Sequence, residues 1–241
     1  MRDSPQYYKL EYEMSEAKVI DEPIYRNRRY VFEDRLVAGD LLARKLKDHV
    51  NSDAIVLAIP AGGVPVGYVV ANKLGLRLDV MVVRKIHIPW NREAGFGAVS
   101  WDGTVIFNEP LLMQLRLSED EVKMCIEEEM EKIRKRLRIF RGDRSPTNLR
   151  DKTVVLVDDG LASGYTMLAA ARSVKKSESK KIIVGVPTSS IIAIKLLQPH
   201  VDKIICLNIR DELIYAVADA YKFWHDLSDD EVLDFLKTHQ I

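Results

Sequence analysis

Short apolar runs alternate along this chain with longer segments in which apolar residues recur every three or four positions. The runs predict buried strands, and the periodic segments predict helices with one face on a core. We expect strands at residues 54–59, 78–83, 153–157, 181–186 and 203–209. We expect helices at residues 32–49, 64–74, 118–139, 166–176 and 191–197. This alternation predicts an α/β fold, a twisted parallel sheet with helices on both faces.

Two stretches do not follow this alternation. Residues 1–30 mix tyrosines with charges and show no clear period, so we interpret them as an extended arm or cap ahead of one domain over residues 31–241. Residues 86–103 are rich in Pro, Asn, Gly and Trp and predict a long loop, with a strand pair around residues 96–100 and 104–107.

The composition narrows the class of protein. Of the 241 residues, 47% are hydrophobic and 30% charged, which is typical of a soluble globular protein. Lys plus Arg equals Asp plus Glu, 36 each, so bulk charge gives no support for a nucleic-acid partner. The five His and two Cys residues lack metal-ligand spacing, so we expect free thiols and no protein-built metal site. No signal-peptide pattern and no membrane-span pattern occurs, so we expect a cytoplasmic protein with no membrane partner.

The loop after the strand at residues 153–157 carries the candidate chemistry, because ligands of parallel α/β sheets bind beyond the carboxyl ends of strands. Its sequence is Asp158-Asp159-Gly160-Leu161-Ala162-Ser163-Gly164-Tyr165-Thr166. Backbone N–H groups at the start of the next helix favour a phosphate, and Ser163 and Thr166 add hydroxyl donors. The two aspartates are placed to accept hydrogen bonds from a sugar diol. A plain turn with a capping Asp is the alternative, but two adjacent carboxylates after a buried strand would then be an uncompensated electrostatic cost.

Residues 154–167 resemble the phosphoribosyl-diphosphate motif of type I phosphoribosyltransferases: apolar residues, two acids, three small or apolar residues, Ser/Thr-Gly, and Thr two places on. The resemblance implies the type I phosphoribosyltransferase-like fold, with a small hood made by N- and C-terminal segments. It implies that Asp158 and Asp159 hold the ribose 2- and 3-hydroxyls and that residues 162–166 cradle the 5-phosphate. The implied substrate-binding residues are Asp158, Asp159, Gly160, Leu161, Ala162, Ser163, Gly164, Tyr165 and Thr166.

Two further loops are similar to parts of the same family's site. Pro60-Ala61-Gly62-Gly63 looks like the diphosphate loop, although Gly-Gly after a strand is also typical of a plain turn. Arg84-Lys85, ahead of the predicted loop, is similar to the mobile catalytic loop, and the alternative is a solvated basic pair at a strand end. The resemblance implies diphosphate binding by Ala61, Gly62, Gly63, Arg84 and Lys85. It implies catalytic roles for Lys85, Arg84 and Asp159.

Residues 32–43 and the C-terminal part extend the resemblance. The string Phe-Glu-Asp-Arg-Leu-Val-Ala-Gly-Asp-Leu-Leu-Ala resembles the opening of uncharacterised stand-alone phosphoribosyltransferases. The hood candidates are residues 7–30 and 215–227, with Tyr215 at the position of the aromatic residue that stacks on the acceptor base. Ala162 stands where 6-oxopurine enzymes of the family have an aspartate implicated as general base, which disfavours hypoxanthine and guanine.

The resemblance predicts a transferase of nucleotide metabolism that moves ribose 5-phosphate from phosphoribosyl diphosphate to a nitrogen acceptor such as a nucleobase. Diphosphate would leave, and Mg²⁺ would enter bound to the diphosphate substrate. The first alternative is a non-catalytic phosphoribosyl-diphosphate or nucleotide-binding regulator of the same fold. The second is a phosphohydrolase or other phosphate-binding α/β protein. The predicted partners are small-molecule substrates, and a homodimer is left open.

Overall fold

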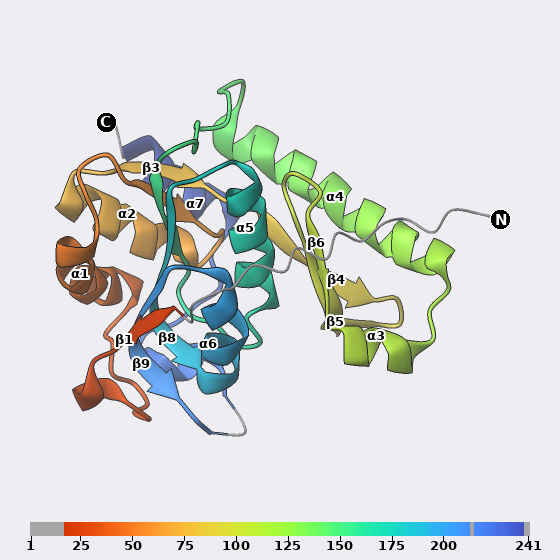
Figure 1. Cartoon of the computed structure of the whole chain (residues 1–241), viewed down its shortest axis with the longest axis horizontal. Coiled ribbons are helices and arrows are strands. Elements are labelled where there is room, and N and C mark those ends of the chain that lie inside the picture. Colours follow the sequence, from red (N-terminus) through yellow and green to blue (C-terminus); the bar gives the residue numbers. More distant parts are fainter. Residues whose placement is uncertain (1–16, 213–214, 239–241) are drawn as a thin grey trace.

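The computed structural model describes residues 17–212 and 215–238 and is built around a six-stranded parallel sheet (Figure 1). In spatial order the strands are β1 (Lys18–Ile20), β9 (Lys203–Arg210), β8 (Lys181–Ser190), β7 (Thr153–Val157), β2 (Ile55–Ala58) and β3 (Arg77–Val80). Five of them match the strands expected from the apolar runs, and β1 was not expected. The predicted parallel α/β sheet is confirmed.

Helices cover both faces of the sheet because side chains along a buried strand point alternately to its two faces. The helices concerned are α1 (Arg35–Leu46), α2 (Gly63–Leu74), α5 (Tyr165–Lys176) and α6 (Ile191–Leu197). Val155 and Val157 of β7 share a buried cluster with α1 and α2. Val154 and Leu156 share the opposite cluster with α5 and α6. The prediction of helices on both faces is therefore confirmed.

The strand register brings two of the predicted loops together. Ala58 at the end of β2 is the partner of Val157 at the end of β7. The backbone N–H of Ile59 donates to the carbonyl of Val157 over 2.8 Å. The loops that follow β2 and β7 therefore start side by side at the carboxyl edge of the sheet.

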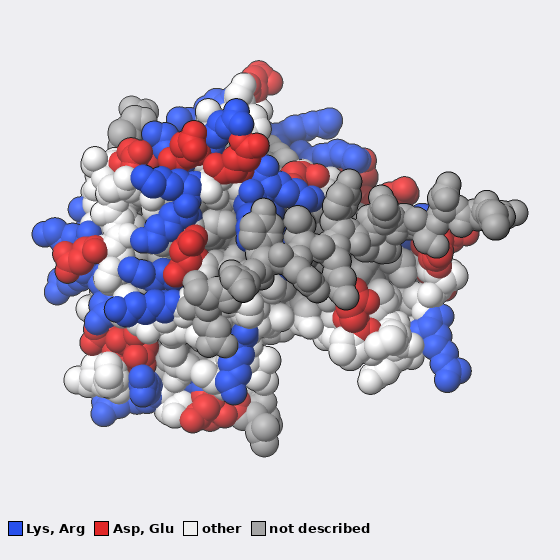
Figure 2. All heavy atoms as spheres, viewed as in Figure 1, with Lys and Arg blue, Asp and Glu red and all other residues white. Residues whose placement is uncertain are grey.

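A second layer lies beside the main sheet, with α5 between the two (Figure 1). It contains an antiparallel sheet of β4 (Val83–Ile88), β5 (Asn91–Ser100) and β6 (Val105–Phe107), with α3 (Glu109–Leu115) and α4 (Glu119–Arg141). Trp101 and Lys176 attach this layer to α5: the Trp101 Nε1–H donates to Ser173 Oγ at 3.1 Å and the Lys176 ammonium to Thr104 Oγ1 at 2.8 Å. Lys and Arg are interspersed with Asp and Glu over the face in Figure 2.

This layer corrects the prediction of a long loop over residues 86–103. Those residues form most of a β-hairpin, and the expected pairing of 96–100 with 104–107 appears as the β5–β6 ladder. The glycines of β5 serve close strand packing, since a Cβ on Gly97 would lie 2.5 Å from the carbonyl oxygen of Ile106. Arg84 and Lys85 consequently lie within β4 and not at the end of a strand of the main sheet.

The N- and C-terminal parts of the described chain pair with each other. The backbone N–H of Tyr30 donates to Asp219, and Phe32 forms a parallel bridge with Tyr221. The chain between these points and the ends includes the edge strand β1 and a final helix α7 (Asp229–Thr238). Four short 3-10 helices complete the described elements: η1 (Pro23–Tyr25), η2 (Lys47–His49), η3 (Gln198–His200) and η4 (Val217–Ala220). Most of the predicted arm, residues 1–16, lies outside the described residues, and the hood and the domain boundary at residue 30 stay predictions.

Candidate active site

The acidic pair Asp158–Asp159 directly follows the buried strand β7. Asp158 is half-buried, and one of its carboxylate oxygens accepts the backbone N–H of Asp159 at 2.9 Å. Asp159 is 8% exposed, and its Oδ2 accepts from Arg35 Nε at 2.8 Å. The Tyr221 hydroxyl donates to the backbone carbonyl of Asp159 at 2.5 Å. Both carboxylates are thus fixed at the carboxyl edge of the sheet.

Asp158 and Asp159 place two carboxyl groups next to each other in one buried site, and each group affects the pKa of the other. Burial raises the pKa of Asp158 well above its ordinary value, and the neighbouring negative charge of Asp159 raises it further. Burial also raises the pKa of Asp159, but the Arg35 guanidinium opposes that rise. The pair is therefore an unfavourable arrangement for the protein alone, which favours a ligand rich in hydrogen-bond donors.

The glycine loop after β2 packs directly on the acidic pair. A Cβ at Gly62 would lie 1.8 Å from Asp159 Oδ2, and one at Gly63 would lie 2.7 Å from the Val157 carbonyl oxygen. The peptide bond between Pro60 and Ala61 is cis. Only glycine permits this approach, because any side chain at Gly62 would occupy the carboxylate's position. The structure thus brings together two of the three predicted loops.

The loop after the acidic pair is anchored to β8. The Leu161 backbone N–H donates to Thr188 at 3.1 Å, and the Ser190 hydroxyl donates to the Ala162 carbonyl at 2.5 Å. Gly164, with a φ of 84°, is the N-cap of α5, and no side chain caps that helix. The first backbone N–H groups of α5 therefore lack a side-chain partner.

Two hydroxyls stand beside this uncapped helix start. Ser163 is exposed and Thr166 half-buried, and among the described residues neither side chain has a hydrogen-bond partner. Hydroxyls and backbone N–H groups at a helix N-terminus can together bind a phosphate.

Arg84 and Lys85, the basic pair ahead of the third predicted loop, have hydrogen-bond partners outside the acidic pair and the glycine loop. Arg84 Nε donates to Glu129 of α4 at 2.6 Å, and Lys85 Nζ lies 3.4 Å from the Glu93 carbonyl oxygen. Within the described ranges, no hydrogen bond or ion pair joins either residue to the acidic pair. Glu129 is buried; burial alone would raise its pKa, but hydrogen bonds from three neighbouring side chains lower it. Those neighbours are Lys132, Arg84 and His87.

Residues 215–220 lie against one end of the loop at residues 160–164, here called the anion loop. A Cβ on Gly160 would lie 2.5 Å from Val217. Tyr215, the candidate acceptor-stacking residue, donates its hydroxyl to Thr188 Oγ1 at 3.1 Å, and burial raises the pKa of its phenol. Its ring centroid lies 5.7 Å from the guanidinium carbon of Arg210. Tyr215 therefore binds Thr188, the same residue that packs against Gly160.

Several polar residues near the site were not singled out from the sequence. Arg35 belongs to the opening string at residues 32–43, which carried a resemblance but no role. Asn208 and Arg210 are fully buried on β9 near Tyr215, and the Asn208 Oδ1 and Arg210 Nε atoms have no partner in the described structure. Their positions in an apolar strand were the only signal available.

Metal sites and membrane spans are the two remaining features to consider in the described residues. No group of three or more His, Cys, Asp or Glu side chains there is arranged to hold a metal ion. No helix within residues 17–212 and 215–238 has the length and apolar character needed to cross a membrane. A Mg²⁺ ion that arrives bound to a diphosphate substrate does not need a cluster of protein ligands.

The parallel α/β sheet carries an acid pair, a glycine loop and an uncapped helix start at one edge. Residues 34–220 match the model of the phosphoribosyl transferase domain. The chain belongs to this family. The type I phosphoribosyltransferase resemblance inferred from residues 154–167 is thereby confirmed.

Individual relatives agree with the family match. The chain is 32% identical over 206 residues to a provisionally named phosphoribosyl transferase of Mycobacterium tuberculosis, found in strains H37Rv and CDC 1551. That match covers 86% of this chain and 46% of the relative, so the chain spans about half the length of these curated relatives. The solved structure of TT1426 from Thermus thermophilus superposes with a TM-score of 0.70 at 32% identity, covering 85% of this chain and 97% of that one.

Proposed function

We propose that this protein transfers ribose 5-phosphate from phosphoribosyl diphosphate to a nitrogen atom of an acceptor and releases diphosphate. The observation that carries the proposal is the contact of Gly62 with the carboxylate of Asp159, one loop away from the uncapped start of α5. A donor with two phosphate-bearing ends and a ribose diol between them fits this arrangement of groups. Family membership supports the same reaction class.

Each group of the site has a proposed task on the donor. Asp158 and Asp159 accept hydrogen bonds from the ribose 2- and 3-hydroxyls, and residues 162–166 bind the 5-phosphate. The backbone from Ala61 to Gly63 receives the diphosphate. The bond from the anomeric carbon to the diphosphate oxygen breaks with its electron pair on oxygen. The acceptor nitrogen forms the new bond to carbon and gives up its proton to solvent. Mg²⁺, if bound with the donor, would supply charge neutralisation for the departing diphosphate.

Arg84 and Lys85 are the proposed cationic groups at the departing diphosphate, where positive charge would stabilise the transition state. The role requires Arg84 to leave Glu129 or to act together with it at the diphosphate. In the conformation of this structure, Arg84 forms an ion pair with the buried Glu129, and this is the contact that Arg84 would leave.

The acceptor is proposed to lie under the segment after β9, with Tyr215 against its ring. Ala162 presents a methyl group where a carboxylate would be needed to take a proton from N7 of a 6-oxopurine. We therefore propose a nucleobase or other nitrogen acceptor distinct from hypoxanthine and guanine. A cytoplasmic setting in nucleotide metabolism and a homodimer belong to the same proposal.

Diphosphate release tests this proposal and separates it from a non-catalytic regulator of the same fold. Purified protein would be mixed with phosphoribosyl diphosphate and each of a panel of nucleobases, with Mg²⁺ present or replaced by EDTA. The proposal expects release that depends on donor, acceptor and Mg²⁺ together. Tight donor binding without release for any acceptor would favour the regulator, and no donor binding would contradict both.

A further inference from the structure

Arg35 joins the start of α1 to the acidic pair. Asp34 caps α1 by accepting the Val37 backbone N–H at 2.8 Å, which fixes the direction of the first helical residue, Arg35. The Arg35 side chain is buried and reaches Asp159 Oδ2 with its Nε at 2.8 Å. Its Nη1 donates to the backbone carbonyl of His225 at 2.9 Å.

The guanidinium is held from the other side by the C-terminal segment. Its central carbon lies 3.8 Å from the ring centroid of Trp224, a stacking distance that favours a cation on an indole face. The Trp224 ring is in turn 5.2 Å from the ring of Tyr221, whose hydroxyl binds the Asp159 backbone. Side chain and backbone of Asp159 are therefore both held by groups from segments far from it in sequence.

The contact leaves one carboxylate oxygen of Asp159 for a ligand. Arg35 binds Oδ2, while Oδ1 receives no hydrogen bond from Arg35 and has the neighbouring carboxyl of Asp158 as its side-chain partner, a contact that a ribose diol would replace. A planar guanidinium fixes a carboxylate in direction as well as in charge, which an ammonium does less well. Resting on the proposed function, we propose that Arg35 is a positioning residue that orients Asp159, so that its second oxygen is presented to the ribose diol of the donor.

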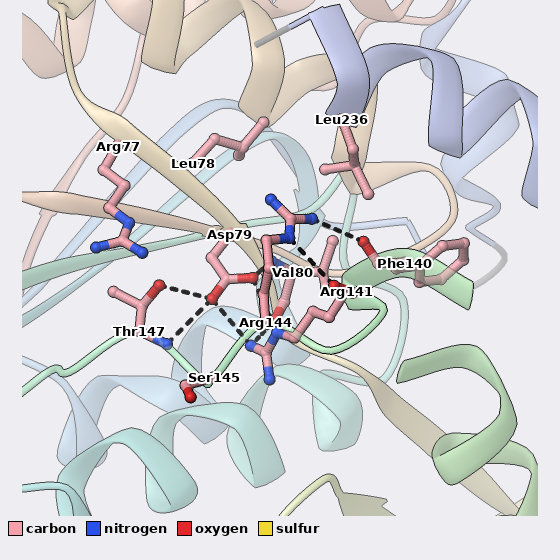
Figure 3. Close-up of a pocket in the computed structure, with 10 residues that line it drawn as sticks. All are labelled: Arg77, Leu78, Asp79, Val80, Phe140, Arg141, Arg144, Ser145, Thr147 and Leu236. Atoms are coloured by element: carbon pink, nitrogen blue, oxygen red, sulfur yellow. Dashed lines mark hydrogen bonds and ion pairs between the residues drawn. The ribbon is translucent and has the colours of Figure 1, made fainter. Parts of the chain in front are cut away.

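The same fold contains a matched ion pair away from the site. Arg141 of α4 pairs with Asp79 of β3 at 3.0 Å, and its guanidinium carbon lies 4.0 Å from the ring centroid of Trp101. The side chains are 6% and 13% exposed, against 8% and 11% for Arg35 and Asp159. Figure 3 shows Arg141 beside Asp79, together with Thr147, which also binds that carboxylate. Asp79 lies two strands from β7, so this pair is a control for stability without donor contact.

Four variants test the inference: Arg35→Gln, Arg35→Lys, Arg141→Gln and Arg141→Lys. For each, Tm is measured first, and affinity for Mg²⁺-phosphoribosyl diphosphate is then measured by calorimetry at a temperature where every variant is folded. Inorganic diphosphate, which has no ribose, is titrated in parallel. Should Arg35→Gln not fold, the comparison of Arg35→Lys with Arg141→Lys carries the same test.

We expect both Gln variants to lower Tm, because each breaks a buried ion pair. Only Arg35→Gln should weaken donor binding, by about tenfold or more, since a misplaced binding group loses most of its contribution. Arg35→Lys should restore part of that loss, and inorganic diphosphate should bind within about twofold of wild type in all variants. Equal donor affinity in folded Arg35→Gln and wild type would overturn this inference alone. Absence of donor binding by the wild type would overturn the proposed function and this inference with it.

Discussion

Replacing Asp158 by Asn should stabilise the fold while it weakens donor binding. Asp158 is half-buried next to Asp159, and the hydrogen bond it accepts comes from its own neighbour's backbone N–H. Because burial and the adjacent charge raise its pKa, the folded protein tolerates this carboxylate less well than the unfolded chain does. An amide keeps the shape and removes the charge.

The size of the effect follows from this setting. A single substitution that relieves such a conflict gains about 0.5–2 kcal/mol in free energy of unfolding. We expect the lower half of that range, because solvent reaches the half-buried carboxylate and screens the repulsion. For a chain of 241 residues the Tm should rise by about 2–4 °C for each kcal/mol.

The pH dependence of the Tm difference should have the sign that follows from the raised pKa of Asp158. A carboxyl group whose pKa is raised by folding holds its proton more tightly in the folded state, so its contribution to stability falls as pH rises from the ordinary Asp value through the raised one. The Tm gain of Asp158→Asn should therefore be largest at neutral pH and vanish below the ordinary Asp pKa of 3.8.

Thermal unfolding from acid to neutral pH measures this gain, with donor calorimetry on the same samples. Asp79→Asn is the control of opposite sign, because it breaks the ion pair with Arg141 and should lower Tm. A Tm for Asp158→Asn that equals or falls below that of the wild type at neutral pH would refute the argument that this carboxylate is held at an electrostatic cost.

Three further predictions concern other parts of the site. Gly62→Ala should weaken donor binding by about tenfold or more and lower stability by about 1–3 kcal/mol, since its Cβ would lie 1.8 Å from Asp159 Oδ2; unchanged donor affinity by calorimetry would contradict it. Glu129→Gln should lower the free energy of unfolding by about 1–3 kcal/mol at neutral pH, and because the Glu129 pKa is lowered, urea titrations should show the difference shrinking as pH falls through that pKa. With Ala162 in the anion loop, diphosphate release with hypoxanthine or guanine should be far below that with another acceptor, and efficient turnover of either base would show that a general base lies elsewhere.

The main sheet could be predicted from the sequence because its strands are buried on both faces. Such strands read as continuous apolar runs, and five were located from them. The edge strand β1 is three residues long and half exposed, so its sequence carries no such run. The β4–β5 hairpin was mistaken for a loop because glycine usually marks irregular backbone. Here Gly97 permits the close approach of β6, a requirement of packing that spacing does not reveal.

Part of the candidate site could likewise be predicted from local sequence, and part of it could not. Asp158, Asp159 and the loop to Thr166 are contiguous and follow a strand, so local sequence predicted their order and setting. The contact of Gly62 with Asp159 was not predicted, because it depends on the pairing of β2 with β7, which the apolar runs alone do not assign. Arg35 is 124 positions from Asp159, and no local pattern predicts that pair. The place of Arg84 against Glu129 likewise depends on how α4 packs, which the charge pattern of that helix left open.

Calorimetric titration of Mg²⁺-phosphoribosyl diphosphate into the wild type and into the Asp158→Asn, Asp159→Asn double variant tests the central claim most directly. Circular dichroism would first establish that the double variant is folded, and ribose-free diphosphate would be titrated for comparison. We predict saturable donor binding by the wild type and a loss of about tenfold or more in the double variant, since both acceptors for the ribose diol lose their charge. Equal donor affinity in the two folded proteins would contradict the assignment of the acidic pair to the ribose.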